Sequence, residues 1–353
     1  MIAKIAFIMT QPDAYSQTFV HAQRRYLTGE ITTLWDMGRW SEEGPIQTQD
    51  CPNFDEALAR FFVRKQINVV LAQFGLSGAN VVGACRQLAI PLVVYFHGYD
   101  AYTKSILRNH AVQYQQLFDY GSSLIVVSQD MKEQLISLGA PAEKIVYVRS
   151  GVNDIFFERY PPLDSKTFVA VGRFVAKKAP HLTLYAFREV LKRHPEVRLI
   201  MIGAGQPLVD VCIDLVIAWG MKDSVEFMGV LDQSQIMEVF KRSFCFLQHS
   251  VTTFLEGDSE GTPLSVLEAS AAGLPVISTK HKGIKEAVLD GETGLLVDER
   301  DVDGMIDCMC RLLADGEKAR QMGDIGRQHI RKNYSMEEYI SGLNRIIAMA
   351  LTR

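Results

Sequence analysis

The stretch DSEGTPLSVLEAS, Asp258 to Ser270, predicts the start of a helix between two buried strands. Pro263 is favoured at the first position of a helix, and Thr262 is an acceptable N-cap directly before it. The helical pattern ends at Gly273, where the apolar strand pattern LPVIST follows, and another strand pattern, SFCFLQHS, lies upstream. Strand, helix and strand in this order indicate a parallel sheet covered by helices.

The same order repeats along almost the whole chain of 353 residues. Runs of Val and Ile without polar alternation, such as PLVVYFHG and VRLIMIGAG, predict strands that are buried on both faces of a sheet. Amphipathic stretches such as HLTLYAFREVLKRH lie between them and predict the covering helices. We therefore predict an α/β fold of two doubly wound, Rossmann-like domains.

A break near the middle of the chain separates the two predicted domains. GVNDIFFERYPPLDSK, residues 151–166, contains a Pro-Pro pair and no clean periodicity, so we interpret it as a linker. We expect an N-terminal domain over residues 1–153 and a C-terminal domain over residues 154–353, facing across a cleft. An amphipathic helix predicted at about 335–353 could pack back on the N-terminal domain.

Charge and cysteine content exclude several classes of function. The net charge is −4, and residues 1–153 carry 13 basic and 13 acidic side chains, so we expect no nucleic-acid partner. The six cysteines are mostly far apart and have no zinc-site spacing, which predicts reduced thiols in a cytoplasmic protein. No apolar run is long enough to span a bilayer, and the first residues have no signal-peptide cleavage site.

The predicted helix start is suited to binding an anion. It presents free amides and the positive end of the helix dipole. Gly261 has no Cβ, so a phosphate could approach the backbone closely there. The residues expected to form this site are Gly261, Thr262, Pro263, Leu264 and Ser265.

Glu268 lies in the second turn of the same predicted helix. A carboxylate there could accept two hydrogen bonds from the vicinal hydroxyls of a ribose. The simpler interpretation, that this glutamate only complements the helix dipole, remains open from the residue alone.

These residues belong to a longer pattern. Glu260 and Glu268, with AAGLPVIST and GETGLLVD after them, resemble the E-x7-E signature of the family-four retaining glycosyltransferases. VGRFVAKKAP, residues 171–180, is similar to the Gly-Arg-x-x-x-x-Lys stretch of that family. The resemblance implies a GT-B fold, a nucleotide-sugar donor, and a clamp on the donor diphosphate made by Arg173 and Lys178.

The resemblance and the charges together imply a division of roles. A leaving diphosphate gains negative charge, which Arg173, Lys178 and the helix amides could stabilise without a metal. We therefore expect no metal and no cofactor. The resemblance puts Glu260 beside the reacting sugar, where it would hold hydroxyls or support positive charge at the anomeric carbon, and Glu268 at the ribose of the donor.

The first half of the chain offers a second group of candidates. VVYFHGYDAY, residues 93–102, puts His97 and Asp100 at the carboxyl edge of a sheet, where α/β proteins bind ligands. Relatives carry a His here that contacts the transferred sugar, so the resemblance implies a catalytic role for His97, with Asp100 orienting it or touching a sugar hydroxyl. Gly75 and Ser16 lie in stretches similar to bacterial polysaccharide transferases and are further candidates for acceptor or sugar contacts.

The leading hypothesis is a retaining glycosyltransferase with a front-face mechanism. It would move a sugar from a nucleotide-diphosphate sugar to a glycan or lipid-linked acceptor in polysaccharide or lipopolysaccharide assembly. A nucleotide-sugar epimerase on the same fold and a catalytically silent nucleotide-sugar-binding regulatory subunit are the alternatives. RFFVRK, residues 60–65, mixes aromatic and basic side chains, which suits either peripheral membrane contact or an ordinary amphipathic helix.

Overall fold

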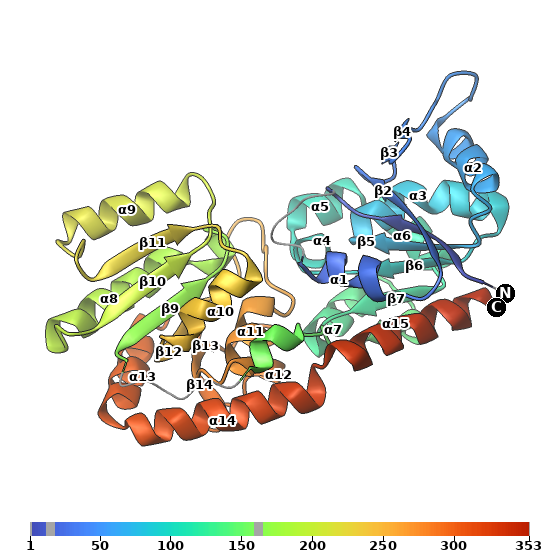
Figure 1. Ribbon diagram of the computed structural model, residues 1–353. Helices are drawn as coiled ribbons and strands as arrows, with labels where there is room; N and C mark the ends of the chain where they lie inside the picture. The colour runs from blue at the N-terminus through green and yellow to red at the C-terminus, as the bar shows by residue number, and fades with distance from the viewer. Residues whose placement is uncertain (1, 12–17, 159–164, 353) are drawn as a thin grey trace. The chain divides into compact units, whose positions relative to one another are not determined.

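The computed structural model describes residues 2–11, 18–158 and 165–352. The chain forms two compact units, each built around its own sheet (Figure 1). The first unit comprises Met1–Arg149 with Glu337–Arg353, and the second comprises Ser150–Met336. The chain therefore leaves the first unit, forms the whole second unit, and returns to complete the first.

The first unit contains an eight-stranded sheet in the order β4-β3-β2-β1-β5-β6-β7-β8. The six strands from β2 to β8 in this order pair in parallel, whereas β3 and β4 form an antiparallel extension at one edge. The bounds are β1 Lys4–Ile8, β2 Glu30–Trp35, β3 Trp40–Ser41, β4 Gly44–Pro45, β5 Val69–Gln73, β6 Leu92–Tyr95, β7 Ser123–Val126 and β8 Ile145–Tyr147.

Helices follow most of these strands, as expected for a doubly wound sheet. They are α1 Thr18–Tyr26, α2 Phe54–Arg64, α3 Gly75–Leu88, α4 Tyr99–Tyr102, α5 Lys104–Asn109, α6 Ala111–Tyr120, α7 Gln129–Ser137 and, from the end of the chain, α15 Met336–Leu351, with a short 3-10 turn at Ala142–Lys144. The amphipathic α15 buries its apolar stripe, and Asn344 Oδ1 accepts a hydrogen bond from the Thr28 amide at 2.9 Å. This helix is an integral part of the first unit.

The second unit contains a six-stranded parallel sheet in the order β11-β10-β9-β12-β13-β14. The bounds are β9 Thr167–Val171, β10 Arg198–Ile202, β11 Val225–Gly229, β12 Cys245–Gln248, β13 Val276–Thr279 and β14 Gly294–Val297. The strand order reverses between β9 and β12, as it does between β1 and β5 in the first sheet. The carboxyl ends of strands at such a reversal are where open α/β sheets bind ligands.

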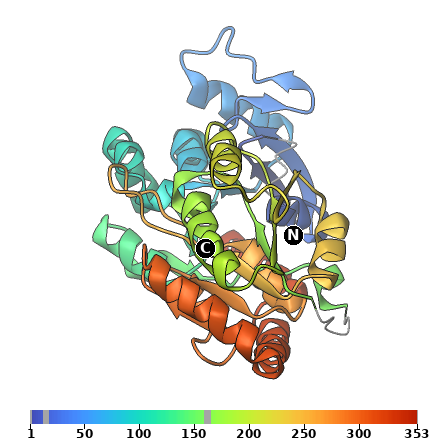
Figure 2. The same cartoon turned by 90° about the vertical axis from the view of Figure 1, so that its left-hand side faces the viewer.

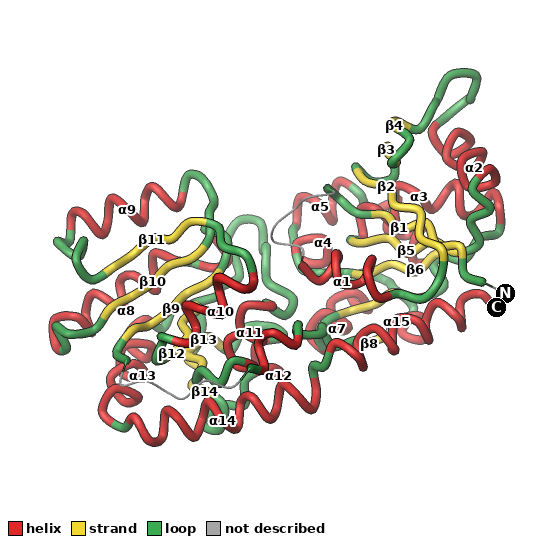
Figure 3. The backbone as a smooth tube through the Cα atoms, in the orientation of Figure 1, coloured by secondary structure: helices red, strands yellow, loops and turns green. Residues whose placement is uncertain are grey.

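Two helical layers cover the second sheet, and each encloses a separate apolar core. Figures 2 and 3 give further views of these layers. One layer contains α8 Pro180–Arg193, α9 Leu208–Ala218 and α13 Val302–Ala314. The other contains α10 Gln233–Lys241, α11 Leu264–Ala271, α12 Ile284–Ala287, the 3-10 turn Asp154–Phe157, and α14 Gly316–Asn333, which contributes to both cores. The predicted pair of doubly wound α/β folds is confirmed.

Candidate functional site

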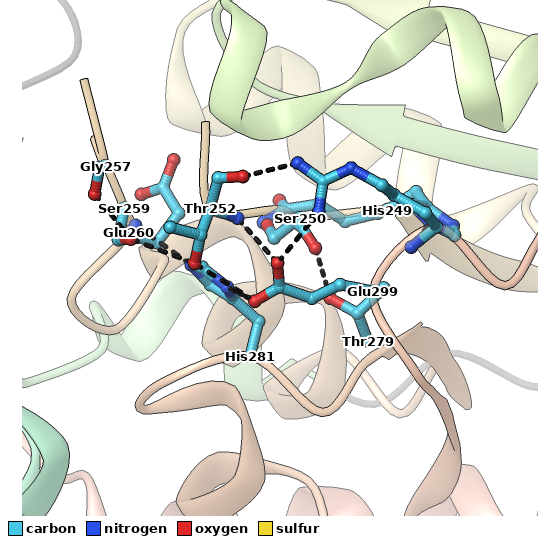
Figure 4. A network of polar contacts seen from close by, with 11 residues as sticks. His249, Ser250, Thr252, Gly257, Ser259, Glu260, Thr279, His281 and Glu299 are labelled. Atoms are coloured by element: carbon cyan, nitrogen blue, oxygen red, sulfur yellow. Dashed lines mark hydrogen bonds and ion pairs between the residues drawn. The ribbon is translucent and has the colours of Figure 1, made fainter. Parts of the chain in front are cut away.

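Loops at the carboxyl edge of the second sheet bring the predicted donor-binding residues together. The loop after β9 holds Arg173 and Lys178, and the loop after β12 leads through Glu260 into α11. The loops after β13 and β14 add His281 and Glu299 (Figure 4). All these loops leave the same edge of one parallel sheet, so residues distant in sequence meet there.

Glu260 and Lys178 form a largely buried ion pair, with 13% and 14% of the two side chains exposed. Lys178 Nζ lies 3.4 Å from Glu260 Oε1 and 3.5 Å from Gln248 Oε1. Burial alone would raise the pKa of Glu260, but the positive charges of Lys178 and then Lys177 lower it to about 2. Glu260 is therefore ionised at neutral pH and supplies one fixed negative charge.

Lys177, next to the predicted clamp residue, secures the loop that precedes Glu260. Its side chain is buried, and Nζ donates to Asp258 Oδ1 at 3.0 Å and to the Ser259 carbonyl at 3.2 Å. The two adjacent lysines thus have different partners: Lys177 binds the Asp258 carboxylate and the Ser259 carbonyl of this loop, and Lys178 pairs with the Glu260 carboxylate.

His281 links Glu260 to Glu299 through a fully buried imidazole (Figure 4). Its Nε2 accepts a hydrogen bond from the Glu260 amide at 3.1 Å, so Nδ1 carries the proton that is donated to Glu299 Oε1 at 2.5 Å. Glu299 Oε2 also accepts from the Thr252 amide at 2.7 Å. Burial acts to raise the pKa of Glu299, but the hydrogen bonds from His281 and Thr252 lower it to about 2. This chain fixes the backbone of Glu260.

The helix α11 begins one residue later than predicted. Pro263 is the N-cap, with φ −66° and ψ 123°, and no side chain caps the helix. Pro263 also has no amide hydrogen, and the Glu260 amide already donates a hydrogen bond to His281 Nε2. Within the part of the chain that the structure describes, the amides of Gly261, Leu264 and Ser265 donate no hydrogen bond. These three are the donors that an anion could use.

Gln248, at the end of β12, joins the lysine loop to the start of α11. Its Oε1 accepts from the Ser265 hydroxyl at 3.0 Å as well as from Lys178, while its Nε2 donates to Ser250 Oγ at 2.8 Å. The Ser265 side chain is therefore committed to the fold, and only its amide remains for a ligand.

Glu268 lies buried in α11, with a relative exposure of 7%. Gln233 Nε2 donates to its Oε1 at 3.1 Å. Burial raises the pKa of Glu268 to about 7, although the Gln233 hydrogen bond and the charge of Lys178 oppose the shift. The two glutamates of the motif therefore differ in charge state at neutral pH.

Arg173 differs from the lysines because its side chain is exposed and makes no ion pair with a described residue. Among residues 2–11, 18–158 and 165–352, no group of three or more His, Cys, Asp or Glu side chains could hold a metal ion. The one Asp-x-Asp string in the sequence, Asp301-Val302-Asp303, starts α13, where Asp301 accepts a capping hydrogen bond from the Gly304 amide at 2.8 Å.

In the first unit, His97 follows β6 at the carboxyl edge of the sheet. Its ring packs among Phe19, Phe74 and Tyr95, with centroid separations of 4.5, 4.7 and 4.4 Å. Nε2 lies 2.9 Å from Gln73 Oε1, at the end of the neighbouring strand β5. Burial lowers the pKa of His97 to about 3, so the imidazole is neutral at pH 7.

Asp100 binds backbone amides rather than the His97 ring. Oδ1 accepts from the amides of His97 at 3.1 Å and Gly98 at 2.9 Å, and Oδ2 accepts from Gly75 at 2.8 Å. Burial raises the pKa of Asp100, and these amide donors oppose the shift. Because both oxygens accept hydrogen bonds from the backbone and Asp100 is fully buried, the structure shows this carboxylate holding the His97 loop.

Gly75 is also enclosed by the fold. A Cβ at this position would lie 2.3 Å from Phe96 and 2.6 Å from the Tyr114 hydroxyl. The absence of a side chain thus allows α3 to start close against β6. Ser16, the third candidate for an acceptor or sugar contact, lies outside the described residues.

Two family models cover most of the chain. Residues 152–329 match the model described as Glycosyl transferases group 1, and residues 39–155 match Glycosyltransferase Family 4. The chain belongs to the group 1 glycosyltransferase family. The resemblance that rested on Glu260, Glu268, Arg173 and Lys178 is therefore confirmed at the level of the family.

Curated relatives of this group 1 chain include two proteins named as biosynthesis glycosyltransferases. It is 31% identical over 240 residues to WcaL of Escherichia coli, named as a colanic acid biosynthesis glycosyltransferase, with 66% of this chain and 58% of WcaL covered. It is 30% identical over 254 residues to the amylovoran biosynthesis glycosyltransferase AmsK of Erwinia amylovora, covering 69% of this chain and 61% of AmsK. The chain thus spans about three fifths of the length of these curated relatives.

Solved structures share the fold at low sequence identity. Anabaena HepE, crystallised in complex with UDP, superimposes with a TM-score of 0.76 at 16% identity, covering 99% of each chain. Sucrose-phosphate synthase from Thermosynechococcus elongatus gives 0.79 at 18% identity, again over 99% of each chain. These likenesses establish the GT-B fold of the group 1 chain.

The stretch at residues 60–65 proves to be an ordinary amphipathic helix segment. Phe61 and Phe62 are buried in the core of the first unit, and Arg64 and Lys65 both pair with Glu43. Its aromatic side chains are thus unavailable to a membrane. Within the described residues, no helix is long and apolar enough to cross a bilayer.

Several residues of the site were not predicted from the sequence. They are Lys177, Gln233, Gln248, His281 and Glu299. A usable signal exists for two of them, because His281 and Glu299 each come two residues after a buried strand. Polar residues at that place belong to the ligand-binding edge of a parallel sheet.

Proposed function

We propose that this protein is a retaining glycosyltransferase that transfers a sugar from a nucleotide-diphosphate sugar to a glycan or lipid-linked acceptor. The observation that carries the proposal is the Lys178–Glu260 ion pair near the start of α11, where the amides of Leu264 and Ser265 donate no hydrogen bond to a described residue. In such a site the Lys178 cation can stabilise the leaving diphosphate, and the Glu260 carboxylate can stabilise the positive charge that develops on the sugar.

The donor diphosphate would bind at the start of α11. The amides of Gly261, Leu264 and Ser265 supply neutral donors, and Lys178 and the exposed Arg173 supply charge. Together they would stabilise the charge that develops as the glycosidic bond breaks, which supports a route that needs no metal.

Glu260 suits an electrostatic role better than proton transfer. A carboxyl group with a pKa of about 2 is ionised at neutral pH and is a weak base, so it neither donates nor takes up a proton efficiently. We assign it to the hydroxyls of the sugar and to the positive charge at the anomeric carbon. The acceptor hydroxyl would then attack on the face that the diphosphate leaves, and the departing phosphate would take its proton.

Glu268 and His97 complete the assignment. The Glu268 carboxylate would accept hydrogen bonds from the two ribose hydroxyls of the donor. His97, neutral at pH 7, would contact the transferred sugar as a hydrogen-bonding group rather than as a cation. The names of WcaL and AmsK support an acceptor in bacterial polysaccharide assembly. We place the reaction in the cytoplasm or peripherally at the inner face of the membrane, as expected from the sequence.

The test combines binding with product analysis. A thermal-shift screen with UDP-, GDP- and ADP-linked sugars identifies a donor, because a ligand that binds the folded state raises its melting temperature. That donor is then incubated with glycan and lipid-linked acceptors, and NMR reports the anomeric configuration of the product. An α-linked product from an α-linked donor supports retention, and a β-linked product overturns it. Epimers formed without acceptor, or binding without transfer, would indicate the epimerase or the silent subunit.

A further inference from the structure

A chain of buried polar side chains crosses the first unit and ends at His97. His97 Nε2 lies 2.9 Å from Gln73 Oε1, Gln73 Nε2 donates to Gln23 Oε1 at 2.5 Å, and Gln23 Nε2 donates to the Tyr339 hydroxyl at 2.5 Å. Gln23 and Gln73 are fully buried, and Tyr339 is 2% exposed. The four residues come from β5, the loop after β6, α1 and α15 (Figure 1).

Two buried glutamine side chains side by side are costly unless their amides are paired. An apolar residue at either position would pack without that cost. The polar pair is therefore informative, because each amide contributes to an uninterrupted path between His97 and Tyr339 and to no other side chain among those described.

The direction of the hydrogen bonds determines the tautomer of His97. The NH2 groups of Gln23 and Gln73 both donate towards Tyr339, so the carbonyl oxygen of Gln73 is what His97 meets. A carbonyl oxygen can only accept, so Nε2 of His97 must carry the ring proton. Nδ1 then carries a lone pair, and it forms no hydrogen bond with a described residue.

We propose that Gln73, Gln23 and Tyr339 are positioning residues that hold His97 as the neutral Nε2–H tautomer, so that Nδ1 accepts a hydrogen bond from a hydroxyl of the bound sugar. The proposal rests on the proposed function and deepens it, because it states which atom of His97 meets the substrate and which hydrogen-bonding role that atom has. It also extends the functional machinery to α15, 242 positions further along the chain.

The tautomer can be measured on the full-length protein without any substrate. Histidine labelled with 15N reports the protonated nitrogen by its chemical shift, and a His97→Gln variant identifies the His97 signals among the eight histidines. We expect Nε2–H at pH 7. A spectrum that shows Nδ1–H would mean that the chain runs in the opposite direction, with Tyr339 as the donor, and would overturn the proposal.

Tyr339→Phe tests the far end of the chain. It removes one hydroxyl and keeps the ring, so Gln23 loses its acceptor and a fraction of His97 should shift to the Nδ1–H tautomer. Tyr120→Phe is the matched control, because among the described residues this hydroxyl bonds only to the carbonyls of Cys85 and Ile90, in the same unit. The control should leave the His97 signals unchanged. The proposal is contradicted if the His97 signals change equally in both variants, or if they do not change in Tyr339→Phe.

Kinetics separate this inference from the proposed function. With a donor in hand, we expect Tyr339→Phe to lower kcat about 2- to 10-fold, the effect of one lost hydrogen bond, with the donor KM within about twofold of the parent. Tyr120→Phe should keep the parental kcat. If no donor supports transfer but His97 carries its proton on Nε2, the proposed function is wrong and the tautomer assignment stands. If the protein transfers sugar but His97 carries its proton on Nδ1, the proposed function stands and the tautomer assignment is wrong.

Discussion

Binding of a nucleotide sugar at pH 7 should release about half a proton from Glu268. Burial raises the pKa of this carboxyl to about 7, so about half of the molecules carry the proton before the donor binds. A ribose that donates two hydrogen bonds requires the ionised carboxylate, and binding would therefore displace the proton. Below pH 7 the donor affinity should fall up to tenfold per pH unit.

Isothermal titration calorimetry measures this release as a difference in heat between buffers with small and large ionisation enthalpies, such as phosphate and Tris. A nucleotide sugar is the right ligand, because its diphosphate has no proton to lose near pH 7. Glu268→Gln should abolish the difference between buffers. Glu238→Gln, which removes an exposed carboxylate paired with Lys241, should keep it. Equal heats in both buffers for the parent protein would refute the assignment of Glu268 to the ribose.

The same pKa makes stability depend on pH in a defined direction. A raised folded-state pKa means that the folded protein binds this proton more tightly than the unfolded chain, whose glutamate has a pKa of 4.5. The contribution is fully present below pH 4.5 and is lost as pH rises through 7. The difference between 4.5 and about 7, at about 1.4 kcal/mol per unit, amounts to about 3 kcal/mol. Chemical denaturation of the parent and Glu268→Gln at pH 5 and 8.5 measures it.

Three further changes have defined outcomes. Lys178→Ala should weaken donor binding and lower kcat at least about 100-fold, because the diphosphate loses a positive charge and Glu260 loses its counter-ion. Parental turnover in this variant would contradict the assignment of Lys178 to the diphosphate. His281→Ala leaves the Glu260 amide without its acceptor, and we expect kcat to fall by about 10-fold with the overall fold retained by circular dichroism. Leu343→Ala, in the buried face of α15, should reduce the free energy of unfolding by about 2–4 kcal/mol, whereas the exposed Met349→Ala should change it by less than about 0.5 kcal/mol, both by urea titration.

The folds of both units were predictable because their information is local. Runs such as TFVAV (167–171) and KIAFI (4–8) are apolar after their first residue, as expected for strands covered on both faces of a sheet. Pro263 and Gly273 predicted the two ends of α11 to within one residue, because proline fixes a backbone conformation suited to a helix start and glycine readily adopts the left-handed conformation, here φ 84°, that ends a helix. Strand pairing then follows from the parallel, doubly wound pattern.

The polar network was not predictable because it depends on residues from separate loops. His281 meets Glu299 and the Glu260 backbone only once three strands lie in register at one edge of a sheet. Asp100 is similar, since its sequence position beside His97 suggests a pair of side chains, whereas its carboxylate instead accepts from three amides. A sequence shows which side chains can donate or accept hydrogen bonds, but only the folded chain shows which donor pairs with which acceptor.

The return of the chain to the first unit in α15 has a consequence for biosynthesis. The first 149 residues cannot form a complete unit when they leave the ribosome, because the helix that buries Tyr339, Leu343 and Ile346 is synthesised after the whole second unit. During translation the second unit can therefore finish folding first, although it comes later in the sequence. The surface that α15 covers in the finished protein stays exposed for that interval. We expect chaperones and proteases to act on this surface in the nascent protein.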